Sequence, residues 1–524
     1  MDRLTGWEPG WRREDRDRIS VPEHHQPLTD TAVLDSLATD LRAAHYDSEG
    51  VSDLLGDDAN AALGRGVWWP ALRATSAAPP ARRPLATLIR LFLLGSDEPR
   101  VAVAEAFAST SIDVLISNGV LERVDGERVR VILDIRPHAD DVRDYLVVSD
   151  QDAAMRSGPV THDHVLGIGG ASISLARAII REPVGSALDL GTGCGIQALH
   201  LNTHAEGIVA TDTNPRALAL AAATARLNGM SWDLREGSLF EPVGDERFDL
   251  IVSNPPFVVG AGSQDYEYRD SGMEGDALCA RLIREVPAHL APGGTAQLLA
   301  NWIVHEGADW RERVGSWIAD TGLDGWVVQR ELADPVDYIS LWLSDAGEEP
   351  DQVAARGAAW LDWFKRERIA GIGMGVITLR DRRGRSGAPD VVLEEITGAG
   401  EEVTGAEAKA FLDRREYLRE TTDDALLAAR LKTAPVFLDA QSLPGDDGWQ
   451  EIGATVRRPG GPGAVLGVDE VSRALLAGCR GQVPLGALIE LLAGFHDVDA
   501  EALAQAALPV VREAIGRGIL YEVR

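Results

Sequence analysis

Hydrophobic residues in the first third of the chain recur at helical spacing, with turn residues between the runs. The segment PLATLIRLFLLG (Pro84 to Gly95) opens with proline and closes with glycine, the asymmetry of a helix start and stop. Two shorter helices are predicted at about Val101–Ala108 and Ser111–Asn118. Next, GVLERVDGERVRVIL (Gly119 to Leu133) predicts two strands joined at an Asp-Gly turn. Three short helices followed by a hairpin predict a winged-helix-like domain.

Part of this pattern returns near the end of the chain. PLGALIELLAGF (Pro484 to Phe495) matches the helix that starts at Pro84 at an offset of 400 residues. AIGRGILYEV (Ala514 to Val523) resembles LISNGVLERV (Leu115 to Val124), and each has a helix end, a glycine and a strand start. Chance similarity between two amphipathic helices is the alternative, but two matches favour a second winged-helix-like module.

The middle of the chain alternates short β-rich runs with helical periods. The runs SALDLGTG, EGIVATD, RFDLIVSN and GGTAQLLAN predict successive strands, and DGWVVQREL, DYISLWLS and IAGIGMGVITLRD predict the later ones. Strands that alternate with helices are typical of an α/β fold with a doubly wound, Rossmann-like sheet. The polar, Gly-rich stretch between Arg382 and Pro389 is a plausible boundary at the end of this sheet.

These patterns divide the chain into four parts. We expect an extended N-terminal arm over residues 1–30, a winged-helix-like domain over 31–145, the α/β domain over 146–385 and a C-terminal domain over 386–524 that ends in the second winged-helix-like module.

Composition and charge narrow the class of protein. Hydrophobic residues make up 45% and charged residues 25% of the 524 residues, a globular composition. The net charge of −31 repels phosphate backbones, so it counts against general duplex binding, although an acidic surface also simply favours solubility. The apolar runs are short and broken by charge, and the charged N-terminus has no signal-peptide pattern. Three scattered cysteines without a CxxC pair suit a reducing cytoplasm.

The first candidate site is a Gly-rich turn in ALDLGTGCGIQALHL (Ala187 to Leu201). Gly191, Gly193 and Gly195 follow a predicted strand and precede a predicted helix, where free N–H groups and a close backbone approach suit a ligand. Such a turn alone also serves NAD or FAD. The G-x-G-x-G spacing, Asp189 at the strand end and the lack of a following basic residue or long phosphate loop argue against a dinucleotide.

A second acid follows at the end of the next strand. Asp212 comes 23 residues after Asp189, the separation at which an acid hydrogen-bonds ribose hydroxyls. An N-cap role for the following helix is the alternative; Asn214 is the better cap candidate and both roles are compatible. Ser238, after the third strand, is positioned to reach an adenine edge.

The reacting group is predicted at SNPPF. Asn254, Pro255, Pro256 and Phe257 directly follow an apolar run, and two prolines cannot continue a central strand. The amide oxygen of Asn254 and the backbone carbonyl of Pro255 can each accept an N–H of a planar –NH₂ group, and Phe257 can stack on it. A plain strand-ending turn is the alternative for Asn-Pro-Pro alone.

Together these segments resemble class I S-adenosylmethionine-dependent methyltransferases. Asn-Pro-Pro-Phe resembles the motif of members that methylate planar nitrogen in adenine, guanine or glutamine. The layout over about residues 160–345 is similar to the HemK-like release-factor glutamine methyltransferases and the "small" ribosomal RNA methyltransferases. The resemblance implies acceptor chemistry at the four motif residues and S-adenosylmethionine contacts at Asp189, Gly191, Thr192, Gly193, Gly195, Asp212, Thr213, Ser238, Leu239 and Asn254.

The acceptor stays open between a protein glutamine and an RNA base. The acidic charge favours protein, whereas Phe257 as the fourth motif residue and the winged-helix-like flanks favour RNA. HemK-like enzymes have nothing like this C-terminal region, a departure that weighs against release factor as substrate. A non-catalytic DNA-binding regulator and a small-molecule methyltransferase are further alternatives, and the flanking modules are expected to dock a protein or dimerise.

Two further features near the site have both a functional and a purely structural interpretation. HVLGIGGASISLARAI (His164 to Ile179) is either a lid over the cofactor or a domain connector with a first packing helix. His162 and His164 have no evident third ligand, so no metal is expected.

Overall fold

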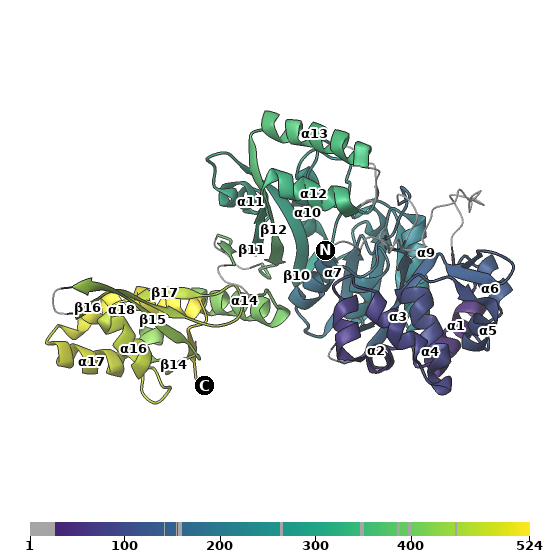
Figure 1. Cartoon of the computed structure of the whole chain (residues 1–524). Helices are drawn as coiled ribbons and strands as arrows, with labels where there is room; N and C mark the ends of the chain where they lie inside the picture. Colours follow the sequence, from purple (N-terminus) through teal and green to yellow (C-terminus); the bar gives the residue numbers. More distant parts are fainter. Residues whose placement is uncertain are drawn as a thin grey trace, which may run out of the picture.

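The structure is a computed structural model. It describes residues 27–523, apart from short gaps at 141, 153–154, 156–159, 263–265, 346–349, 385–387, 397–400 and 446–447. Figure 1 shows a helical N-terminal part, a central sheet and a C-terminal module that projects to the other side. The predicted arm lies outside the described residues up to residue 26. Among the helices that the structure describes, none is long and apolar enough to cross a membrane.

The N-terminal part contains the helices and the hairpin that the sequence predicts. The helix starting near Pro84 is α4 (Arg83–Leu88), continued by a π turn, η2 (Ile89–Leu93). Three helices and a 3₁₀ turn precede it: α1 (Thr31–Ala43), α2 (Ser48–Leu63), α3 (Trp69–Ser76) and η1 (Pro80–Arg82). After it come β1 (Glu98–Pro99), α5 (Arg100–Ala106), α6 (Ile112–Ser117), β2 (Leu121–Arg123) and β3 (Arg128–Val131). The strands pair in the order β1-β3-β2. The winged-helix-like assignment stays a prediction.

A second hairpin, which the sequence did not predict, connects this part to the α/β sheet domain. It consists of β4 (Leu133–Ala139) and β5 (Asp144–Asp150). Two backbone N–H groups of β5, those of Leu146 and Val148, donate to side chains of the α9 segment. The predicted boundary at residue 145 falls inside β5, a strand that contacts the α9 segment, and the division into domains stays a prediction.

The centre is an eight-stranded sheet of the expected α/β class. Its order is β13-β11-β12-β10-β9-β6-β7-β8. All pairs are parallel except those that β12 makes with β10 and β11. The strands are β6 (Val184–Leu190), β7 (Ala205–Asp212), β8 (Asp233–Glu236), β9 (Phe248–Ser253), β10 (Leu290–His305), β11 (Asp324–Ala333), β12 (Ile369–Arg380) and β13 (Val391–Glu395).

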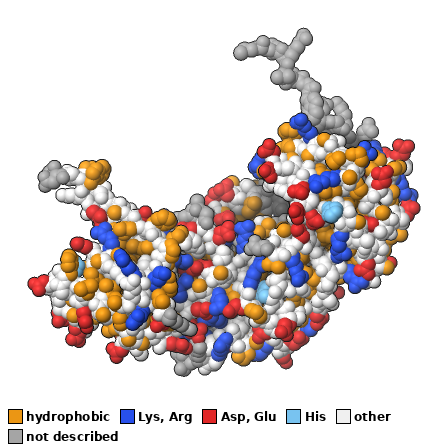
Figure 2. Space-filling view, turned by 90° about the horizontal axis from the view of Figure 1, so that it is seen from below, with side chains coloured by type: hydrophobic (Ala, Val, Ile, Leu, Met, Phe, Trp, Pro, Cys, Tyr) orange, Lys and Arg blue, Asp and Glu red, His pale blue; other side chains and the backbone are white. Residues whose placement is uncertain are grey.

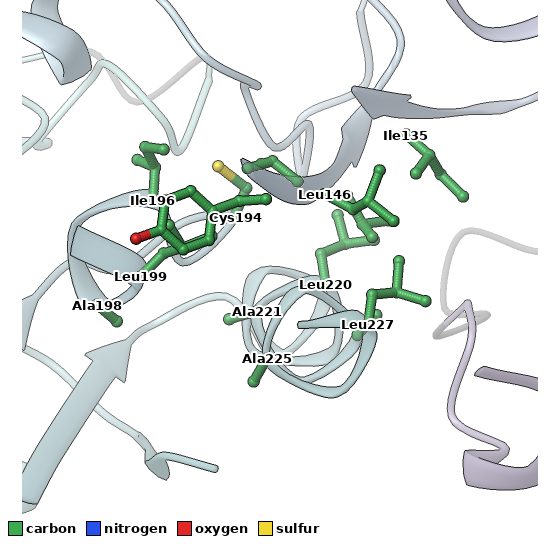
Figure 3. Close-up of a cluster of buried hydrophobic side chains, with 14 of the residues drawn as sticks. Ile135, Leu146, Cys194, Ile196, Ala198, Leu199, Leu220, Ala221, Ala225 and Leu227 are labelled. Atoms are coloured by element: carbon green, nitrogen blue, oxygen red, sulfur yellow. The ribbon is translucent and has the colours of Figure 1, made fainter. Parts of the chain in front are cut away.

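Helices cover both faces of this sheet, as the doubly wound pattern predicts. Alternate residues of β9 enter different cores: Leu250 and Val252 pack with α8 and α9, and Ile251 packs with α10 and α11. The helices and one 3₁₀ turn are α7 (Gly170–Ala178), α8 (Ile196–Leu201), α9 (Pro215–Leu227), η4 (Glu241–Val243), α10 (Ala277–His289) and α11 (Trp310–Ala319). Figure 3 shows side chains of α8 and α9 in one cluster with Ile135 and Leu146 of the second hairpin.

One sequence prediction about the end of the sheet was wrong. DYISLWLS is not a strand but most of helix α12 (Pro335–Asp345), and α13 (Pro350–Arg366) follows it before β12. Buried Tyr338, Ile339 and Leu343 lie on one helical face, and Asp334 accepts backbone N–H bonds at the helix start. The sheet continues past the predicted boundary at residue 385, because β13 pairs in parallel with β11, and the position of the boundary stays a prediction.

The C-terminal module combines helices with two small sheets. One sheet pairs β14 (Leu431–Thr433) with β18 (Leu520–Glu522), and the other has the order β15-β16-β17. The remaining elements are α14 (Gly405–Glu420), α15 (Asp423–Ala428), β15 (Phe437–Gly445), β16 (Gly448–Arg457), β17 (Val465–Val468), α16 (Glu470–Gly478), α17 (Leu485–His496) and α18 (Ala500–Gly516).

The helix ends that resemble each other in sequence also have the same turn. Gly119 follows α6 with a φ of 72°, and Gly518 follows α18 with a φ of 70°. The residue after each glycine then donates its N–H back to the helix, Val120 to the Leu115 carbonyl at 2.9 Å and Ile519 to the Ala514 carbonyl at 2.8 Å. This is the geometry of a helix stop at a left-handed glycine. It supports the interpretation of two related modules.

Candidate functional site

The predicted site residues meet at the carboxyl ends of three neighbouring parallel strands. Leu190, the last residue of β6, pairs with Thr211 of β7 and with Ser253 of β9. The Gly-rich turn, Asp212 and Asn254 each follow one of these paired residues. In an open α/β sheet this edge is where ligands bind.

The Gly-rich turn is left-handed at all three glycines and open above two of them. The φ angles of Gly191, Gly193 and Gly195 are 74°, 55° and 86°. A Cβ on Gly195 would lie 2.6 Å from the Trp232 ring, so no larger residue fits there. A Cβ on Gly191 or Gly193 would meet nothing within 4 Å. The backbone of the turn therefore borders free space.

Asp189 is fully buried beneath this turn. Its Oδ2 accepts hydrogen bonds from the Thr192 hydroxyl at 2.7 Å and from the Ala198 N–H at 3.0 Å. Its Oδ1 is buried with no hydrogen-bond partner among the described residues. Burial raises the pKa of Asp189 to about 7, although the two hydrogen bonds lower it. One buried oxygen of this side chain thus has no donor in the described part of the chain.

Asp212, the last residue of β7, contacts the Gly-rich turn from the neighbouring strand. Its Oδ2 accepts from the Gly193 N–H at 2.9 Å, and its Oδ1 accepts from the Asn214 N–H at 2.9 Å. Burial raises the pKa of Asp212 despite these bonds. Asn214 caps α9 with its own side chain, which confirms it as the better cap. Asp212 is therefore not needed for that role.

The other predicted contacts flank Asp212. Thr213 follows it and is exposed. The Gly237 N–H donates to the Asp212 carbonyl at 3.0 Å, which brings the next two residues, exposed Ser238 and half-buried Leu239, to the same edge. The structure thus gathers all of the predicted cofactor residues, and their individual roles stay predictions.

Two loops meet over this edge, and sequence reasoning missed their contact. The Glu267 N–H donates to the His162 carbonyl at 3.1 Å. In the side chains of the same two residues, His162 Nδ1 lies 3.3 Å from Glu267 Oε1. The Asn214 amide also donates to the Asp163 carbonyl at 3.0 Å. The loop after the Asn-Pro-Pro-Phe motif therefore meets the segment before α7. These contacts join residues far apart in sequence, and no local pattern signals them.

The Asn-Pro-Pro-Phe motif leaves one polar atom unused. Asn254 Oδ1 is buried with no hydrogen-bond partner in the part of the chain that the structure describes. Pro255 is buried, Pro256 is half-buried, and the Phe257 ring meets the Trp342 ring edge-on with 6.2 Å between centroids. An unpaired buried acceptor costs about 1–3 kcal/mol, so such an atom is a candidate for ligand contact.

Helices α12 and α13 hold the chain directly after the motif. The Tyr338 hydroxyl accepts from the Val259 N–H and from the Asn301 amide, both at 2.9 Å. The Trp360 indole donates to the Val259 carbonyl at 3.0 Å. Sequence reasoning missed this support because it assigned a strand to Tyr338. The Asp-Pro start and the helical spacing of apolar residues were the signals that could have found it.

Comparison with family models divides the chain into three matched regions. Residues 167–308 match the methyltransferase small domain. Residues 43–132 and 409–522 match two families described as domains of unknown function, DUF7059 and DUF7782. The matched central region contains every residue predicted to contact the cofactor or the acceptor, from Asp189 to Phe257.

Three curated relatives share this central region. The release factor glutamine methyltransferase of Geobacter sulfurreducens is 39% identical over 136 residues, which cover 23% of this chain and 48% of the relative. A Methanocaldococcus jannaschii protein named for protein N5-glutamine methyltransferase activity is 30% identical over 141 residues, 26% of this chain and 71% of the relative. Ribosomal RNA small subunit methyltransferase C of Alcanivorax borkumensis is 29% identical over 160 residues, 30% of this chain and 44% of the relative. This chain thus spans less than half the length of two of these three relatives.

Proposed function

The chain belongs to the class I S-adenosylmethionine-dependent methyltransferases of the HemK-like group, and from this membership we propose that it is an N-methyltransferase. The proposed acceptor is a planar nitrogen on a macromolecule, with a protein glutamine amide favoured. The relatives match only the central region of the chain, so the activity of the whole protein is part of the proposal.

The residues at the carboxyl edge fit S-adenosylmethionine. Free space above Gly191 and Gly193 admits a ligand to the turn, and Asp189 Oδ1 is a buried acceptor without a protein donor among the described residues. When bound, the cofactor supplies a methyl group on a positively charged sulfur. Asp212 would hold the ribose hydroxyls, and Asp189 would orient the methionine end. Thr192, Gly195, Thr213, Ser238 and Leu239 would complete the pocket.

One observation carries the acceptor chemistry: the buried Oδ1 of Asn254 has no hydrogen-bond partner among the residues that the structure describes. The lone pair of a planar –NH₂ group is delocalised, which makes the nitrogen a weak nucleophile. Asn254 Oδ1 and the Pro255 carbonyl would each accept one N–H and favour a pyramidal nitrogen. Pro255 and Pro256 fix the chain direction, and Phe257 would stack on the flat group. Holding the nitrogen in line with the methyl group is the main contribution that these residues make.

Relatives named for glutamine methylation and the net charge of −31 support a protein acceptor. RNA guanine N2 or adenine N6 is the second candidate, supported by Phe257 and by the relative named for ribosomal RNA. A non-catalytic regulator has no use for an intact acceptor motif. Docking or dimerisation by the flanking modules and residence in the cytoplasm, where free Cys194, Cys279 and Cys479 would stay reduced, also belong to this proposal.

Transfer of a labelled methyl group tests the proposal. Purified protein and tritiated S-adenosylmethionine are added to a lysate from a strain that lacks the protein, and protein, RNA and small molecules are then separated. We expect label in protein, at a glutamine side-chain amide by mass spectrometry, and none with the Asn254→Ala variant. Label that RNase removes would overturn the choice of protein, and label among small molecules would overturn a macromolecular acceptor.

A further inference from the structure

A groove with a volume of about 320 Å³ lies in the C-terminal module, far from the Gly-rich turn. It opens between β14, the base of the β15–β16 hairpin and the end of α16. Figure 2 shows the molecule from below, with the C-terminal module on the left of the picture. Lys and Arg side chains (blue) lie among hydrophobic ones (orange) on this module. The groove belongs to none of the chemistry described above.

The floor of the groove is aliphatic. Leu438 of β15, Val456 of β16 and Leu476 of α16 line it. Val456 and Leu476 also belong to the core of the module, so the floor is fixed, whereas Leu438 is 49% exposed. A rigid apolar floor that reaches the surface favours an apolar side chain over water.

Two cations that have no carboxylate partner among the described residues lie at the rim of the groove. Lys432 and Arg480 face each other in an isolated antiparallel bridge, so their side chains share one face. Neither lies within 4.0 Å of a carboxylate among the described residues, and both are exposed. The third cation, Arg473, pairs with Glu451 at 3.2 Å at the surface, where such pairs exchange easily. The groove therefore offers positive charge in a chain with a net charge of −31.

The apolar surface continues along the hairpin beyond the groove. Pro444 lies six residues after Leu438 on β15, hence on the same face, and it pairs with Trp449. Trp449 is 75% exposed. A bound segment several residues long would contact Pro444 and Trp449 as well as the floor of the groove.

We propose that this groove binds an acidic peptide segment of a partner protein. Carboxylates of the segment pair with Lys432 and Arg480, an apolar side chain sits on Leu438 and Val456, and the chain continues toward Trp449. Nucleic acid is the weaker fit, because no aromatic side chain lines the groove and the acidic chain repels a polyanion.

The test uses the full-length chain and an array of short peptides in which a Leu or Phe is flanked by Asp and Glu. The best-binding peptide is then measured by fluorescence anisotropy beside its Asn and Gln counterpart and beside single-stranded oligouridylate. Lys432→Glu with Arg480→Glu reverses the rim charge, and Leu438→Asn alters the floor without changing charge. Arg65→Glu with Arg73→Glu, at two exposed arginines of the N-terminal part, is the matched control. Thermal unfolding checks that all variants fold.

We expect saturable binding of the acidic peptide. The rim variant should bind it about tenfold or more weakly, and the wild type should bind the Asn and Gln peptide more weakly by a similar factor. The control variant should change the affinity by less than about twofold. Leu438→Asn should weaken it several-fold without changing its salt dependence. Absence of saturable binding, or equal loss in the rim and control variants, would overturn the proposal. Tighter binding of oligouridylate that depends on Lys432 and Arg480 would overturn the choice of a peptide.

Discussion

Asp189 and Asn254 stand at the ends of neighbouring parallel strands, and each carries one buried side-chain oxygen without a hydrogen-bond partner among the described residues. Unpaired buried acceptors are uncommon in folded proteins. These two lie on adjacent strands at the carboxyl edge of the sheet, which is where ligands bind in open α/β sheets. The predictions below separate the roles of the two residues.

Asn254→Ala should abolish methyl transfer while leaving the affinity for S-adenosylmethionine nearly intact. The side chain would touch the acceptor nitrogen, so its loss should lower kcat about 100-fold or more. Calorimetry should give a Kd for the cofactor within about threefold of the wild-type value. Asn254→Asp keeps an accepting oxygen and should retain part of the activity. Equal loss of turnover and cofactor affinity would contradict the acceptor role.

Asp212→Ala should weaken the cofactor instead. The carboxylate would hold the ribose, and it also fixes the Gly193 N–H, so its loss both removes a contact and loosens the turn. We expect the Kd to rise about tenfold or more, with a smaller change in kcat at saturating cofactor. Asp499→Ala, which removes the N-cap of α18 in the C-terminal module and touches no site residue, is the control. An unchanged Kd of the cofactor for Asp212→Ala would contradict the assignment of Asp212 as the ribose contact.

The buried Asp189 should make stability fall as pH rises. Its pKa of about 7 in the folded chain lies above the ordinary value of 3.8, so the folded state binds more protons than the unfolded state between these values. The stabilising proton is present below pH 3.8 and lost as pH rises through about 7. From pH 5 to pH 8 the free energy of unfolding should fall by roughly 2.5 kcal/mol more in the wild type than in Asp189→Asn. Urea unfolding at both pH values measures this, and parallel curves would contradict it.

The sequence predicted which candidate residues lie together better than it predicted the framework around them, because each of these residues is marked by a local pattern. The Gly-rich turn, Asp212 and Asn254 each follow an apolar strand directly, and parallel strands bring such positions to one edge. The closure of the loops over that edge rests on His162 and Glu267, which lie far apart in sequence. No local pattern specifies such a contact.

The errors in the fold also have physical reasons. Pro137 inside β4 argues against a strand, but the two-stranded hairpin tolerates it because its outer edge has no further pairing. The aromatic and β-branched residues of α12 resemble a strand by propensity, and packing of Tyr338 onto the chain after the motif outweighs that preference. The five-residue β13 is too short to stand out from the polar stretch before it.

Tyr338→Phe should lower turnover without affecting the cofactor. The substitution leaves the Val259 N–H and the Asn301 amide without their shared acceptor, at a cost of about 1–3 kcal/mol in stability. The chain after Phe257 then loosens, and kcat should fall about tenfold because the acceptor is held less well. The Kd of the cofactor should stay within about twofold of wild type. Tyr521→Phe, at an exposed tyrosine of the C-terminal module, should change neither quantity. A parallel loss of cofactor affinity would indicate general damage to the fold rather than a positioning role.

Gly119→Ala and Gly518→Ala should each destabilise their own module, and a Cβ on Gly518 would in addition lie 3.1 Å from the Arg414 and Arg458 side chains. Both glycines have a φ near 70°, where a Cβ is strained by about 1–2 kcal/mol. Hydrogen exchange resolves the two effects, because the amides of α6 and β2 report on one module and those of α18 and β18 on the other. Gly126→Ala and Gly467→Ala, at glycines without a left-handed φ and with open space around the Cβ, are the matched controls and should change protection by less than about 0.5 kcal/mol. If Gly518→Ala leaves the C-terminal amides unchanged while Gly119→Ala exposes the N-terminal ones, the two helix stops are not equivalent, and the argument for a repeated module loses its structural support.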